Sequence, residues 1–157
     1  FSESQVFEIH GAIDALQCTR ECGVGLFSAD PFDVRVDPRT MRAEPPLPQC
    51  PRCGALARPN VLMFGDAEFD DARNQVQRAA FQGWLSGLGR HPRIAIIECG
   101  AGTAIPSIRI TCEDLARRFR GTLIRINPRE PEVPPGQIGL PLGALEGLRA
   151  LNERLDT

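Results

Sequence analysis

The sequence contains no lysine. All 18 of its basic residues are arginine, and with 20 acidic residues the formal net charge is −2. Proteins that bind nucleic acid directly usually carry a basic excess, so the composition gives no support for such binding. No stretch approaches the roughly 18 apolar residues of a membrane span, and the first residues lack the layout of a signal peptide. We therefore expect a cytoplasmic protein that binds neither nucleic acid nor membrane.

Several catalytic motifs are also missing. The chain has no phosphate loop ending in Gly-Lys-Ser, no helix with the His-Glu metal motif and no Ser-His-Asp set. Histidine is scarce, with two residues, and His10 stands beside a glycine at the end of an apolar segment. A lone histidine is more often structural than catalytic, yet its pKa makes it the most useful proton acceptor near neutrality.

Cysteine, in contrast, is patterned. Four of the six cysteines form two close pairs, CTREC (18–22) and CPRCG (50–54). Such pairs can turn two sulfurs toward one point, and two pairs supply the four soft ligands of a tetrahedral site, for which zinc is the default. Two disulfides or four unrelated core thiols are the alternatives. Both are disfavoured because the loop over residues 24–49 has too few apolar residues to stay folded unless a bound metal ion joins its ends. We expect a closed, structural zinc site formed by Cys18, Cys22, Cys50 and Cys53.

The remaining pattern predicts alternating strands and helices. Short strands are expected at residues 5–9 and 14–18, an irregular loop at 25–48, an extended segment at 59–65 and a helix at 70–88. The β-branched run 93–97 is typical of a strand buried on both faces. A helix at 107–119, a strand at 122–126 and, after a proline-rich connection, a helix at 142–155 complete the chain. This order predicts a parallel sheet wound with helices.

Ligands of such sheets collect beyond the carboxyl ends of the strands. Residues 100–103 and Asn127 follow two of the expected strands. Gly100 and Gly102, before a helix, are compatible with backbone amides that face a phosphate or a ribose, although a strand-to-helix turn often needs glycine simply to make the corner. Asn127 could contact a ribose or cap a turn.

Taken together and in this order, FEIHG (7–11), the paired cysteines, CGALARP (53–59), VLMFG (61–65) and INP (126–128) closely resemble the sirtuins, the NAD-dependent protein deacylases. The resemblance covers essentially the whole chain. It implies an α/β fold with a partial Rossmann-like parallel sheet and a small inserted zinc module with four cysteine ligands. It divides the chain into a strand leading to the catalytic histidine (1–12), the zinc module (13–60) and the C-terminal part of the NAD-binding domain (61–157).

The resemblance also implies roles for single residues. His10 would be the general base that takes a proton from the NAD ribose, and Val61, Leu62, Phe64 and Gly65 would bind the acyl-lysine substrate. The residues implied for NAD are Gly100, Ala101, Gly102, Thr103, Asn127, Gly143 and Ala144. The match at 100–103 is displaced by about one residue, Asp66 replaces the usual glutamate, and the first cysteine pair has three intervening residues instead of the commoner two.

The expected function is NAD-dependent removal of acyl (acetyl) groups from lysine in a protein or peptide. The family's Gly-Ala-Gly loop and Gln-Asn-x-Asp stretch would precede Phe1, so the resemblance implies the C-terminal portion of a sirtuin. Alone it should bind NAD weakly or not at all and be inactive, with the missing N-terminal half as a candidate partner. The alternative is a non-catalytic, zinc-containing module that binds a peptide or protein. A thiol redox protein is disfavoured because the four cysteines form a closed set.

Overall fold

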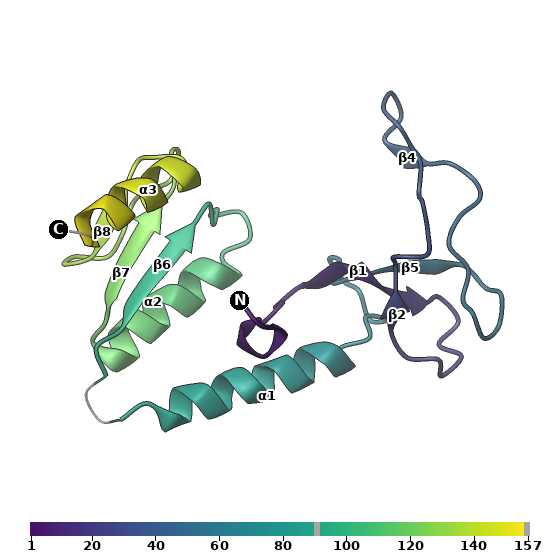
Figure 1. Cartoon of the computed structure of the whole chain (residues 1–157), viewed down its shortest axis with the longest axis horizontal. Helices are drawn as coiled ribbons and strands as arrows, with labels where there is room; N and C mark the ends of the chain where they lie inside the picture. The colour runs from purple at the N-terminus through teal and green to yellow at the C-terminus, as the bar shows by residue number, and fades with distance from the viewer. Residues whose placement is uncertain (90–91, 156–157) are drawn as a thin grey trace. The chain divides into compact units, whose positions relative to one another are not determined.

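The computed structural model describes residues 1–89 and 92–155, and by its contacts the chain divides into two units, Phe1–Gly87 and Leu88–Thr157 (Figure 1). Helix α1 (Ala72–Gly87), which the resemblance grouped with the nucleotide-binding part, clusters with the first unit. Within the described residues, no helix is both long and apolar enough to cross a bilayer.

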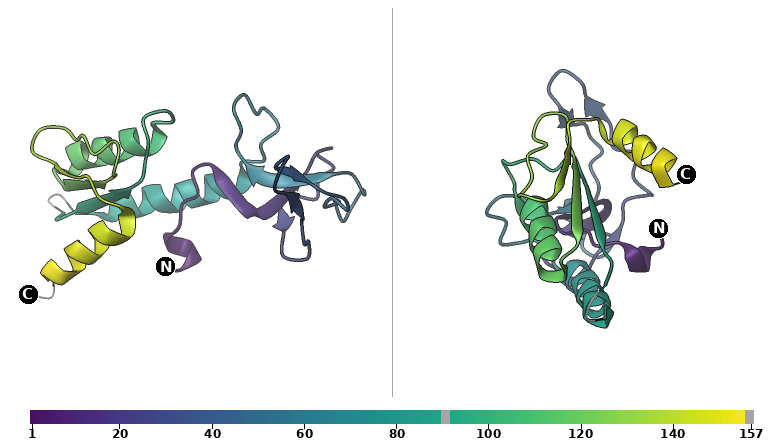
Figure 2. Two further views of the ribbon diagram at one scale, coloured as in Figure 1. Left: turned by 90° about the horizontal axis from the view of Figure 1, so that it is seen from above. Right: turned by 90° about the vertical axis from the view of Figure 1, so that its left-hand side faces the viewer.

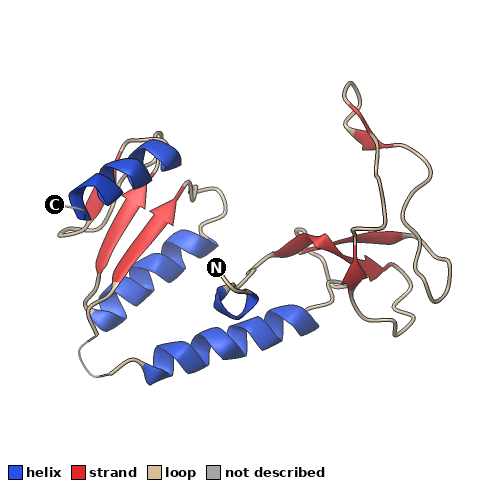
Figure 3. Cartoon of the chain, in the orientation of Figure 1, coloured by secondary structure: helices blue, strands red, loops and turns tan. Residues whose placement is uncertain are grey.

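The first unit is built on a three-stranded antiparallel sheet of order β2-β1-β5. Strand β1 (Gly11–Cys18) pairs with β2 (Phe27–Ser28) on one edge and with β5 (Ala57–Val61) on the other. The long connection between β2 and β5 carries only the two-residue strands β3 (Val36–Asp37) and β4 (Arg42–Ala43), which pair with each other. Most of this connection is therefore loop, as expected (Figure 3).

The strand expected at residues 5–9 is wrong. A short 3-10 helix, η1 (Glu3–Gln5), begins the chain, and β1 starts only at Gly11. The backbone of Glu8 is bound by side chains of α1, because its N–H donates to Gln77 Oε1 (2.9 Å) and its carbonyl accepts from Asn74 Nδ2 (2.9 Å). Phe7 packs against the Phe81 ring of the same helix, at 5.7 Å between centroids. These tertiary contacts replace the strand ladder that the apolar pattern suggested.

Helix α1 confirms the helix expected at 70–88. Asp70 caps it, since its Oδ1 accepts a hydrogen bond from the Ala72 amide (3.1 Å). Apolar character does not decide which of its residues are buried: Val76 and Trp84 are largely exposed, whereas Asn74 and Leu85 are the buried residues. The buried face is set by the polar contacts of Asn74 with the N-terminal segment.

The second unit is the expected parallel α/β unit. Strands β6 (Ala95–Cys99), β7 (Thr122–Ile126) and β8 (Ile138–Leu140) form a parallel sheet of order β6-β7-β8. Helices α2 (Ser107–Phe119) and α3 (Ala144–Leu155) cover opposite faces (Figure 2). Arg125 points to α2, where it meets Glu113, and the next residue, Ile126, lies against Gly147 of α3. This alternation is the period-two pattern of a strand.

Two expectations for the second sheet need correction. Strand β6 begins and ends two residues later than the run 93–97, and it is not buried on both faces, because Ile97 is 50% exposed. It is the edge strand, with β7 beside it in the centre. Strand β8 falls in the segment expected to be a proline-rich connection; its three residues are held by pairing with residues 124–126 of β7.

Candidate metal centre and nucleotide-binding edge

The four patterned cysteines come together in the first unit. One sulfur from each of Cys18, Cys22, Cys50 and Cys53 lies within 4.8 Å of the others. The Cys18 and Cys53 sulfurs are 3.6 Å apart and those of Cys22 and Cys50 are 3.5 Å apart. These distances are too long for disulfides, which join sulfurs at about 2.05 Å. Four thiolates at tetrahedral corners about 2.3 Å from zinc would lie about 3.8 Å from each other, so the cluster fits such an ion.

Backbone geometry positions the sulfurs. Cys18 is the last residue of β1, and its register partner Ala57 on β5 places the second pair alongside it; an isolated bridge between Gln49 and Leu56 closes the turn that holds this pair. Within the second turn the Gly54 amide donates to the Cys50 carbonyl (2.9 Å), and Gly54 adopts a φ of 70°. Cys18, Cys50 and Ala55 form a small buried cluster. The fold therefore presents both turns at the same end of the β1–β5 pair.

The surroundings of Cys18 favour the thiolate that metal binding requires. The backbone amide of Arg20 donates a hydrogen bond to its sulfur (3.3 Å), and this contact lowers the pKa of Cys18 to about 6. Since a metal ligand must be a thiolate, the amide prepares the sulfur for coordination. All four ligands come from the protein, which leaves no open position and makes a structural role the fitting one.

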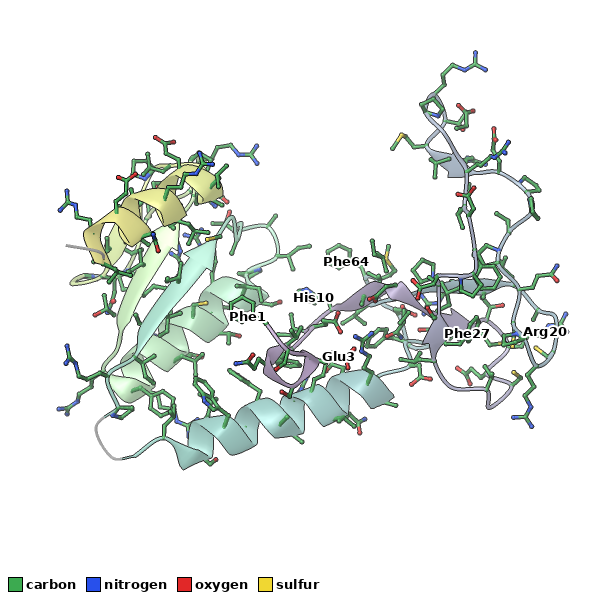
Figure 4. The ribbon with its side chains drawn as sticks, in the orientation of Figure 1. Phe1, Glu3, His10, Arg20, Phe27 and Phe64 are labelled. Atoms are coloured by element: carbon green, nitrogen blue, oxygen red, sulfur yellow. The ribbon has the colours of Figure 1, made fainter. Side chains whose placement is uncertain are left out.

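His10 lies immediately before β1, with a partly buried side chain. Its backbone carbonyl accepts a hydrogen bond from the Leu62 amide at 2.9 Å. The histidine and the segment expected to bind the peptide are therefore neighbours on adjacent strands, although they are far apart in the sequence. Figure 4 labels His10 and Phe64, which come from the two sides of this contact.

The segment expected to bind substrate follows β5, the edge strand of the first sheet. Val61 ends β5, Leu62 and Phe64 are 40% and 87% exposed, and Gly65 adopts a φ of 69°. One edge of β5 pairs with β1, and its other edge carries no strand among the described residues. Such an edge can accept an extended peptide as a further strand.

The seven residues implied for NAD all follow carboxyl ends of the parallel strands. Cys99, Ile126 and Leu140 are register partners across β6, β7 and β8, so the three strands end at one edge. Residues 100–103 follow the first, Asn127 the second, and Gly143 and Ala144 lie just beyond the third, at the start of α3. This edge is where α/β sheets bind ligands. The structure thus brings the predicted nucleotide residues to one place within the second unit.

The side chains at this edge already bind one another. Asn127 is buried; its Nδ2 donates to the Ala101 carbonyl (3.1 Å), and its Oδ1 accepts from the amides of Arg129 and Glu130 (both 3.0 Å). Thr103 donates to the carboxylate of Glu130 through its hydroxyl and through its amide (3.1 Å). The hydroxyl contact lowers the pKa of Glu130, so that carboxylate is charged near neutrality.

Sequence reasoning missed two residues at this edge. Glu130 contacts the loop that was expected to face phosphate or ribose, and its only sequence signal is its position shortly after Asn127. Arg109, in the first turn of α2, is 8% exposed and donates to main-chain carbonyls of both loops. Nothing in the sequence distinguishes it from the chain's other arginines.

Comparison with known proteins finds similarity to NAD-dependent protein deacylases. No protein-family model matches the chain. The NAD-dependent protein deacylase 1 of Archaeoglobus fulgidus is 26% identical over 130 residues, which is 83% of this chain and 44% of that protein. The NAD-dependent protein deacylase of Aeropyrum pernix is 31% identical over 124 residues (79% and 41%), and that of Aquifex aeolicus 27% over 129 residues (82% and 45%).

The chain therefore spans less than half the length of the curated relatives it matches. The similarity nevertheless runs through most of the chain, and the parallel sheet and the cysteine cluster that could bind a metal fit the same family. The chain is therefore similar, over most of its own length, to part of the NAD-dependent protein deacylases, in agreement with the resemblance to sirtuins that its motifs indicate.

Proposed function

We propose that the chain is part of an NAD-dependent protein-lysine deacylase, in which His10 is the general base and the outer edge of β5 holds the acylated peptide. The observation that carries this proposal is the hydrogen bond between the His10 carbonyl and the Leu62 amide. It holds a residue that can accept a proton near neutrality beside the end of β5, whose other edge carries no strand among the described residues and can hold a peptide backbone. The names of the relatives support the same activity.

Each part of the site has a distinct role in this proposal. NAD, when bound, supplies the reactive ribose that accepts the acyl group. Residues 100–103, Asn127, Gly143 and Ala144 bind and orient the nucleotide at the edge where the parallel strands end. His10 holds the proton that leaves a ribose hydroxyl. Val61, Leu62, Phe64 and Gly65 align the peptide and cover the acyl-lysine side chain. The zinc expected at the four cysteines keeps β1 and β5 in register and has no open position for chemistry.

Isothermal titration of the chain with NAD tests the cofactor part. The three parallel strands present one nucleotide edge, so we expect binding that is weak or absent and no micromolar site. Micromolar binding would show that this chain contains a complete NAD site by itself.

Replacing His10 by tyrosine tests the enzyme hypothesis against the binding-module alternative. In the longest natural form of the protein, His10→Tyr should abolish NAD-dependent removal of acetyl from a lysine peptide, because no other described residue near Leu62 is assigned as a base. Binding of the same peptide should persist, since the edge of β5 is unchanged. Deacylation at the unmodified rate would exclude His10 as the base.

A further inference from the structure

The two loops at the nucleotide-binding edge are joined by one buried arginine. Arg109 is the third residue of α2, and its guanidinium contacts the loops that follow β6 and β7. Its Nη1 donates to the carbonyls of Ala101 (3.0 Å) and Glu130 (3.1 Å), and its Nη2 donates to the carbonyl of Glu132 (3.1 Å). One side chain thus holds the loop after β6 and the loop after β7 at the same time.

The partners of Arg109 are unusual for a buried cation. All three acceptors are main-chain carbonyls, and no carboxylate forms an ion pair with it among the described contacts. A buried charge is costly unless hydrogen bonds satisfy it, and a planar guanidinium can reach several carbonyls in fixed directions, whereas a lysine ammonium is a point charge on a flexible stem. The geometry therefore requires arginine at this position.

Two of the residues that Arg109 contacts, Ala101 and Glu130, also bind residues assigned to the nucleotide. Ala101 also accepts from Asn127, and Glu130 binds Thr103 on the other side of its backbone. Displacement of either carbonyl would move Thr103, Asn127 or the Glu130 carboxylate. The positive charge of Arg109 also helps to keep the pKa of Glu130 low, after the larger effect of the Thr103 hydroxyl.

We propose that Arg109 is a positioning residue for the nucleotide site: its guanidinium fixes residues 100–103 relative to residues 127–132 in the arrangement that a bound dinucleotide meets. This inference rests on the proposed function for its ligand. The hydrogen bonds by which Arg109 holds the two loops together, called the clamp below, can be tested without any ligand. It assigns a function to a residue that does not touch the nucleotide and that lies outside every motif of the family resemblance.

Amide hydrogen exchange of the whole chain, followed by NMR, tests the clamp. In Arg109→Met, which keeps an apolar stem and removes every donor, the amides of Thr103, Arg129 and Glu130 should exchange at least about tenfold faster, because hydrogen bonds to charged groups are the stronger ones. The amides of β7 should keep their protection. The matched control is Arg117→Met on the same helix, where an exposed arginine pairs with Asp114; its exchange pattern should be that of the wild type.

Two results would overturn the clamp. Unchanged exchange at Thr103 and Glu130 would show that the loops hold together without Arg109. Equal acceleration throughout β7 would show that Arg109 supports only the fold. If Arg109→Met destabilises the whole unit, Arg109→Lys separates a local effect from a general one, because lysine keeps the charge and lacks the planar guanidinium. The proposal expects faster amide exchange in the two loops in this variant too.

Titration with NAD, monitored by chemical shifts, tests the link to the nucleotide. Arg109→Met should weaken NAD binding by about tenfold, with Arg117→Met equal to the wild type. Equal affinity for NAD in wild type and Arg109→Met would refute the positioning role even if local exchange rises. If the wild type does not bind NAD, as the expectation of weak or absent binding allows, the exchange measurement alone decides whether Arg109 fixes the loops.

Discussion

Gly11 is the residue at which the site leaves no room for a side chain. Its φ is 78°, and a Cβ atom placed there would lie 2.0 Å from the Asn60 carbonyl oxygen on the neighbouring strand β5. The glycine of the His-Gly pair therefore permits β1 and β5 to approach closely beside His10. We expect Gly11→Ala to destabilise the first unit by at least about 2 kcal/mol, from the positive φ and from the forced separation of the strands.

Gly25→Ala is the matched control for this prediction. Gly25 has a φ of 74°, but nothing lies within 4 Å of the position that a Cβ atom would take there, so only the backbone preference of about 1 kcal/mol is lost. Urea denaturation of both variants measures the difference. Equal destabilisation would mean that the contact with Asn60 relaxes without cost and that Gly11 is needed only for its φ.

Arg125 carries the second prediction at this scale. Its side chain is 1% exposed and pairs with the fully buried Glu98 and with Glu113 on α2; the hydrogen bond to Glu98 raises the pKa of Arg125. Arg125→Met would leave the Glu98 carboxylate buried without its partner, which costs about 3–5 kcal/mol. Denaturation of the variant measures this, with the exposed Arg117→Met expected to change stability by less than about 0.5 kcal/mol. Similar values for the two arginines would show that Glu98 becomes solvated or protonated at little cost.

At the scale of elements, the sequence predicted best where local pattern and tertiary structure agree. Helix α2 and strand β7 have the expected bounds, because their residue patterns favour the same elements that pairing and packing in the unit stabilise. Strands β2, β3 and β4, of two residues each, exist only through pairing with other segments. The apolar residues before His10 failed as a strand because side chains of α1 bind the Glu8 backbone.

The candidate site likewise contains residues that the sequence predicted and residues that it did not. The cysteine spacing predicted the cluster because two short turns suffice to gather sulfurs. The strand ends, and hence residues 100–103 and Asn127, followed from the alternation of strand and helix. Arg109 and Glu130 could not be predicted, because their partners lie in loops whose paths depend on the folded unit.

The metal prediction also belongs to the scale of elements. We expect one zinc ion per chain by native mass spectrometry, and removal by a chelator should expose the amides of β5 and of the Cys50 turn, because the loop between β2 and β5 has little else to hold it. Cys18→Ser should lose the ion, whereas Cys99→Ser, an exposed cysteine outside the cluster, should keep it. A metal-free chain about two mass units lighter per cysteine pair would indicate disulfides instead.

At the scale of the whole molecule, the proposed activity draws on both units. His10, the cysteine cluster and the edge of β5 belong to Phe1–Gly87, and every residue assigned to NAD belongs to Leu88–Thr157. The residue assigned as the base and the residues assigned to NAD therefore lie in different units.

The contact division predicts that the second unit folds by itself. Its three strands pair in continuous register, and its helices cover both faces of the sheet. The central strand β7 contains the fully buried Leu123 and Ile126. A fragment of residues 88–157 should therefore give amide resonances for β6, β7 and β8 that overlay those of the full chain. Chelation of the full chain should shift resonances of Phe1–Gly87 and leave those of β7 unchanged, because the four clustered cysteines lie in the first unit. A fragment without dispersed resonances, or loss of β7 protection on chelation, would show that the units depend on each other for stability and that the metal also holds the nucleotide edge in place.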